Sequence, residues 1–90
     1  MHRRYRRSMA RNPTADNVVA ALAVHGPATK EEIAYAMGVS PASGIQAIRA
    51  AATAKPPLIR REQVDPVAKI TTWVLTDEGK RRAEEIDADE

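Results

Sequence analysis

The sequence predicts a small, mostly helical domain with one β-hairpin, in the order helix, helix, helix, strand, strand, helix. Three observations support this α+β fold class. Residues 29–54 carry the capping residues of two consecutive short helices, whereas residues 58–75 contain short runs rich in β-branched residues. Thr76 then precedes two acidic residues, which is typical of the start of a helix.

The first helix is expected over residues 14–25. It begins at a threonine and ends at Gly26-Pro27, where proline cannot continue the helical hydrogen bonds. Apolar residues at helical spacing predict its buried stripe, and a histidine near its end is a further candidate. These residues are Val18, Ala21, Leu22 and His25.

The second helix is expected over residues 30–37. Thr29 and Glu32 form a capping-box pattern ahead of it. Gly38 ends it, because glycine adopts the left-handed conformation without steric cost. Its predicted buried stripe consists of Ile33, Ala36 and Met37, which leaves Tyr35 off that stripe.

The third helix is expected over residues 41–54, after a tight turn. Ser40 can cap it, with Pro41 at its first position, where a missing N–H does no harm. Pro56-Pro57 stops it. The spacing predicts a buried face of Ile45, Ile48 and Ala52. Two helices joined by such a glycine-containing turn indicate a helix-turn-helix motif.

Residues 58–64 and 70–75 predict an antiparallel hairpin, joined by residues 65–69. Neither face of the second strand is wholly polar, so we expect helices to cover one face and to shelter the other in part. Trp73 is expected in or near the core. Thr76 is expected to cap the last helix.

The charges are unevenly distributed. Residues 1–11 contain five arginines and no acidic residue, and residues 77–90 contain three basic and seven acidic residues, although the whole chain has a net charge of only +2. We therefore expect a basic arm over residues 1–13, a folded domain over 14–86 and an acidic tail over 87–90. A basic arm suits an anionic partner such as nucleic acid, with a solvated tail as the alternative.

Other functional classes find no support in the composition. The chain has no cysteine, which excludes disulfides and thiol chemistry. We find no pattern of a nucleophile with its base, a phosphate-binding loop, a cofactor or a metal site, so no enzyme and no cofactor are expected. No secretory signal, membrane span or small-molecule effector is evident, and a cytoplasmic location is expected.

Three segments in order resemble winged helix-turn-helix regulators of the MarR-like and related groups. AYAMGVSPASGIQAIRAA is similar to their turn and recognition helix, the hairpin occupies the wing position, and WVLTDEGKRRAEE is similar to the strand-into-helix step after the wing. The resemblance covers about residues 14–86. It implies a DNA-binding domain of a small prokaryotic or phage transcription regulator, with double-stranded DNA as the partner and residues 41–54 in the major groove.

Two positions depart from that pattern. Gly44 stands where those regulators usually carry an apolar residue, which leaves the rotation of the third helix about its axis open. Pro56-Pro57 stands where they often carry an acidic residue and a glycine.

The candidate DNA-binding residues lie in three places. On the third helix, Gln46 can pair with adenine and Arg49 with guanine, and Ser40 and Ser43 can donate to phosphate. Small residues such as Ala42 and Ala47 would let this helix approach the bases closely. The expected outward face of the helix is Ala42, Ser43, Gln46, Arg49, Ala50 and Thr53.

In the hairpin, Arg60 and Lys69 are the candidate phosphate contacts, although Asp65 opposes that use. Arg60 and Arg61 point to opposite faces of their strand, so at most one faces outward cleanly. In the arm, guanidinium groups are expected to follow the minor groove: Arg3, Arg4, Arg6 and Arg7.

Other interpretations stay open at this point. The outward face of the third helix can be an ordinary solvated surface, because Arg49 and Lys55 are its only cations. The domain can instead be a winged-helix module that binds a protein, or an adaptor that binds nucleic acid without sequence preference. A homodimer through the first or last helix is also open.

Overall fold

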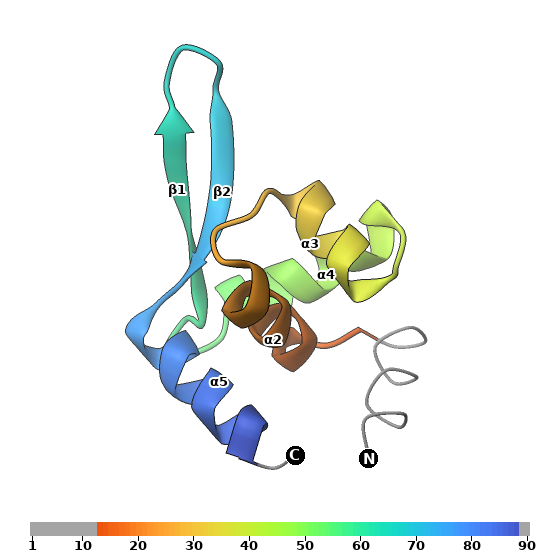
Figure 1. The fold of residues 1–90 in the computed structure, drawn as a ribbon, viewed down its shortest axis with the longest axis vertical. Helices are drawn as coiled ribbons and strands as arrows, with labels where there is room; N and C mark the ends of the chain where they lie inside the picture. Colours follow the sequence, from red (N-terminus) through yellow and green to blue (C-terminus); the bar gives the residue numbers. More distant parts are fainter. Residues whose placement is uncertain (1–12, 89–90) are drawn as a thin grey trace.

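The structure is a computed structural model that describes residues 13–88 (Figure 1). The predicted order of helices and strands is confirmed, with an α+β layout and one two-stranded antiparallel sheet. The elements are α2 (Ala15–His25), α3 (Lys30–Met37), α4 (Pro41–Ala52), β1 (Ile59–Asp65), β2 (Ile70–Leu75) and α5 (Asp77–Ala88). The third predicted helix thus ends at Ala52 rather than residue 54, with Thr53 as its C-cap.

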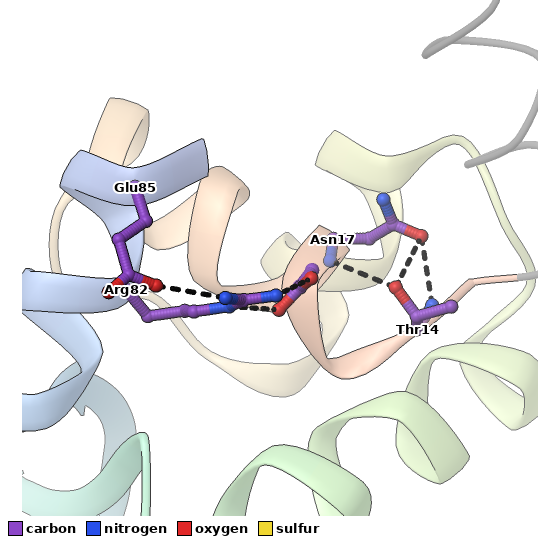
Figure 2. Close-up of polar contacts among 5 residues, drawn as sticks. Thr14, Asn17, Arg82 and Glu85 are labelled. Carbon is purple, nitrogen blue, oxygen red and sulfur yellow. Dashed lines mark hydrogen bonds and ion pairs between the residues drawn. The ribbon is translucent and has the colours of Figure 1, made fainter. Parts of the chain in front are cut away.

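Helices α2 and α3 both begin with a capping box. The Thr29 hydroxyl accepts a hydrogen bond from the Glu32 N–H at 3.2 Å, and the Glu32 carboxylate accepts one from the Thr29 N–H at 2.8 Å, as predicted. Thr14 and Asn17 form the same arrangement at the start of α2 (Figure 2), where the carboxamide oxygen of the buried Asn17 accepts a hydrogen bond from the Thr14 N–H at 2.8 Å. Gly38 ends α3 with a φ of 73°, in the left-handed region.

The core forms where α2, α3 and α4 pack together, and the base of the hairpin closes one end of it (Figure 1). Val18 and Leu22 of α2 are buried as predicted, together with Val19. His25 is exposed, so its predicted place in the stripe was wrong. It occupies the last turn of α2, next to Gly26 as the C-cap.

Helices α3 and α4 approach too closely to leave room for a side chain at Gly44. A Cβ atom on Gly44 would lie 2.8 Å from the Ala34 Cβ and 3.3 Å from the Ala34 Cα. The close packing of the two helices therefore explains why residue 44 is a glycine, where the regulators that the sequence resembles usually carry an apolar residue.

This close contact also sets the rotation of α4. The buried face of the helix consists of Gly44, Ala47, Ile48 and Ala51. The predicted face was wrong at Ile45 and Ala52, which are only half-buried. Ala47 is buried in the core, so it is not available to contact bases.

The hairpin is tied to the helices at its base. Ala28 exchanges two backbone hydrogen bonds with Trp73 of β2, at 3.3 and 2.7 Å, and Trp73 packs against the core as predicted. Ile59 is the buried residue of β1, and every later residue of that strand is exposed. The expected shelter on both faces was therefore wrong for the outer part, because the hairpin extends beyond the helices (Figure 1).

The step from β2 into α5 crosses the segment before β1. Thr76 caps α5, because its hydroxyl accepts a hydrogen bond from the Gly79 N–H at 3.0 Å, as predicted. The same hydroxyl donates to the Pro57 carbonyl at 2.6 Å, and the Thr76 N–H donates to the Leu58 carbonyl at 3.0 Å. A Cβ on Gly79 would lie 2.0 Å from the Leu58 carbonyl oxygen, so only glycine fits there.

Helix α5 is joined to α2 by a bidentate ion pair. The Arg82 guanidinium donates to both carboxylate oxygens of Asp16, at 2.9 and 2.7 Å, and also to Glu85 (Figure 2). The hydrogen bonds that Arg82 donates to Asp16, and then the one to Glu85, raise the pKa of Arg82 above its ordinary value. An arginine guanidinium is charged at physiological pH with or without these bonds, so the pair is ionic in the folded protein. Asp16 and Arg82 lie 66 positions apart in the chain, so local sequence patterns do not indicate this contact.

Candidate nucleic-acid interface

The outward face of α4 is presented as the sequence predicts. The N-cap residue Ser40 accepts a hydrogen bond from the Ser43 N–H at 3.3 Å, and the two hydroxyls are also 3.3 Å apart. At the other end, the Thr53 hydroxyl donates to the Arg49 carbonyl at 2.8 Å. The predicted outward residues are all exposed, and they are Ala42, Ser43, Gln46, Arg49, Ala50 and Thr53.

An open groove of about 590 Å³ separates α4 from the hairpin. Its apolar lining includes Ile45, Ile48 and Trp73. The half-buried state of Ile45 follows from this position, because its side chain borders the groove instead of the core. The groove is therefore a surface that the α4 face and the hairpin share.

Cationic side chains from three elements line this groove. Lys30 comes from the start of α3, Arg49 from α4, and Arg61 and Lys69 from the hairpin, whereas Glu31 is the acidic residue among them. The weak positive charge of α4 alone, noted in the sequence, is thus supplemented by neighbours that lie far apart in the chain. Such a groove favours an anionic ligand.

The two arginines of β1 point to opposite faces, as alternation requires. Arg61 pairs across the sheet with Trp73, and its guanidinium carbon lies 5.8 Å from the centroid of the indole ring. Arg60 pairs with Val74, and its guanidinium lies 3.9 Å from Glu62. The arginine that shares the groove with α4 is therefore Arg61, whereas Arg60 was the predicted phosphate contact.

A signal for Arg61 was present in the sequence. Arg61 lies two residues after Ile59, the apolar start of the strand, so both side chains belong to one face. Had the face of Ile59 been taken as the core side, Arg61 would have been placed beside the helices.

The turn of the hairpin uses Asp65 structurally. Its carboxylate accepts hydrogen bonds from the N–H groups of Val67 and Ala68, at 3.0 and 3.2 Å. Lys69 follows with a φ of 59° and lies at the groove. Asp65 therefore holds the turn in shape, and Val67 is left 91% exposed at the tip.

The remaining predicted contacts lie outside the described residues, and they are Arg3, Arg4, Arg6 and Arg7. Within residues 13–88, histidine, aspartate and glutamate side chains do not gather in a group of three or more that could hold a metal ion. None of the helices in this range combines the length and the apolar character that crossing a bilayer requires.

Comparisons with family models, with curated proteins and with solved structures found no match to this chain.

Proposed function

We propose that this protein binds double-stranded DNA in a sequence-specific manner, as a transcription regulator of the winged helix-turn-helix type acting in the cytoplasm. In this proposal, α4 is the recognition helix and enters the major groove, and the hairpin is the wing and contacts the backbone. The observation that carries the proposal is the exposed α4 face beside a groove lined by cations from three elements.

The chemistry of the α4 face suits base recognition. The paired polar atoms of Gln46 match the major-groove edge of adenine, and those of Arg49 match guanine. The neighbouring residues Ala42 and Ser43 are small, which lets the helix backbone approach the bases. The close packing of α4 on α3 holds this face in one orientation, and a fixed face is what discrimination between base pairs needs.

The test is selection from a random pool of duplexes, at several salt concentrations, with parent and variants in parallel. We expect the parent to enrich a defined sequence. Arg49→Ala should remove the preference at one base pair, at a cost of about 1–3 kcal/mol in discrimination. The matched control Arg81→Ala removes the same charge from an exposed position on α5 and should keep the selected sequence.

Deletion of residues 2–7 separates backbone attraction from base recognition. It should weaken binding to all duplexes about equally, because contacts to phosphates carry no sequence information. If the Arg49 variant and the deletion both bind like the parent, the recognition-helix assignment is wrong.

A second candidate function has an observation of its own. Tyr35 of α3 is 89% exposed beside another groove, of about 520 Å³, which also has Ala21, Pro27 and Ile33 in its lining. The same lining contains Glu31 and Glu32, and an exposed aromatic residue beside a partly apolar groove is typical of protein contact sites. If the parent retains no duplex even at low salt, a module that binds a protein becomes the better proposal.

A further inference from the structure

We infer that the groove between α4 and the hairpin binds one sugar–phosphate strand of the duplex, and that Arg61, which lies over the ring of Trp73, is its central phosphate-binding residue. The inference rests on the proposed function and deepens it. It assigns the backbone contact to Arg61, and it removes that role from Arg60.

The lining of the groove matches a nucleic-acid strand in both of its chemical parts. The cations Lys30, Arg61 and Lys69 would face the phosphates. The apolar surface of Ile45 and Trp73 would face the sugars, which have no charge. Charge complementarity favours this occupant, because Glu31 is the acidic side chain among the residues of the lining.

A contact with Trp73 favours one position of the Arg61 side chain before any ligand binds. Its guanidinium lies over the indole of Trp73, within the range of a cation–π contact. A guanidinium in a cation–π contact can still use its N–H donors, which bind a phosphate in a bidentate manner. Less side-chain freedom is lost on binding when the donor is already positioned.

Trp73, which lies under Arg61, is itself held by contacts with the helical body. Trp73 exchanges two backbone hydrogen bonds with Ala28 and packs on the core, so the indole belongs to the rigid base of the hairpin. By contrast, Arg60 projects from the other face of the strand, toward Glu62 and away from α4. The two arginines therefore have the same charge and adjacent positions in the chain, but Arg61 lines the groove and Arg60 lies on the other face of the strand.

That contrast supplies the experiment. We would measure the affinity of the 90-residue chain for a random-sequence duplex against salt concentration, for the parent, Arg61→Ala and Arg60→Ala. A lost phosphate contact lowers the slope of log K against log salt by about 0.9, which is about an eightfold loss of affinity at about 0.1 M salt. We expect Arg61→Ala to show both changes and Arg60→Ala to change affinity by less than about twofold.

The fluorescence of Trp73 gives a second readout, because it is the single tryptophan of the chain. Addition of the duplex should change its emission in the parent and in Arg60→Ala, and much less in Arg61→Ala. The melting temperature of each variant shows that the fold is kept.

The possible outcomes distinguish a failure of the role of Arg61 from a failure of the proposed DNA-binding function. Equal losses in the two variants would mean that only net charge matters and would overturn the role of Arg61. Unchanged binding by Arg61→Ala would overturn it as well, while the DNA-binding function would stand. A parent that retains no duplex at low salt would overturn the function and this inference together.

Discussion

The helical body and the hairpin are built with very different degrees of constraint. Between α3 and α4, the contact at Gly44 leaves no space for a single methyl group. In the hairpin, every residue of β1 after Ile59 is exposed. The relative positions of the helices and the hairpin are therefore set by close backbone contacts at small residues and at the base of the hairpin. The outer part of the hairpin adds little to them. Substitutions should therefore have effects that fall with distance from those contacts.

The largest effect is expected where the hairpin joins the body. Gly79→Ala places a Cβ only 2.0 Å from the Leu58 carbonyl oxygen, which belongs to the backbone and cannot rotate away. We expect the free energy of unfolding to fall by about 3 kcal/mol, as for severe overpacking. Urea denaturation measures this. The control Glu84→Ala, at an exposed position of the same helix, should change stability by less than about 0.5 kcal/mol.

A smaller loss is expected within the helical body. Gly44→Ala pushes α4 away from Ala34, which costs roughly 1–3 kcal/mol, but alanine favours the helix by about 1 kcal/mol. A net loss near 1 kcal/mol should remain. Ala34→Gly should restore the space, so the double variant should be more stable than the sum of the two single changes implies. Strict additivity in denaturation experiments would show that this contact does not set the helix spacing.

Helix α5 allows a test of a contact between exposed side chains. Arg82→Ala removes the bidentate pair with Asp16. The side chain of Arg82 is 43% exposed in this pair, and that of Asp16 is 41% exposed. Because solvent screens such a pair, we expect only a slight fall in the melting temperature. In the Arg82→Ala variant, hydrogen exchange should nevertheless show that the amides of α5 open faster than those of α3. Arg81→Ala, which removes a contact with Glu78 inside α5, is the matched control.

The smallest effect is expected at the hairpin tip. Val67→Ser replaces a side chain that is 91% exposed, so stability should change by less than about 0.5 kcal/mol. A melting temperature well below that of the parent would mean that the tip contacts something, such as a second copy of the chain. Sedimentation at two protein concentrations would then identify the dimer.

The sequence sufficed for the elements that local chemistry determines. The capping box of Thr29, the left-handed Gly38 and the Thr76 cap each depend on residues within a few positions of one another. The rotation of α4 was not predictable in this way. It depends on Ala34 and Gly44, whose small size becomes meaningful only when two helices are already packed together.

The same distinction between local and long-range contacts applies to the candidate site. The outward face of α4 follows from helical periodicity, and its exposure was predicted correctly. The groove was not predicted, because it assembles Lys30, Arg49 and Arg61 from three elements. Arg60 was the predicted phosphate contact in the hairpin, but it is Arg61 that lines the groove, because neighbouring residues of a strand lie on opposite faces.

The backbone pair between Ala28 and Trp73 also has a consequence for the kinetics of folding. The helices and the hairpin can each form from contacts that are local in sequence, whereas this pair closes a long loop between them. Loop closure carries an entropic cost that must be met before the contact stabilises the chain. We therefore expect the Ala28 and Trp73 amides to become protected in the last step of refolding, after those inside α2 and α4.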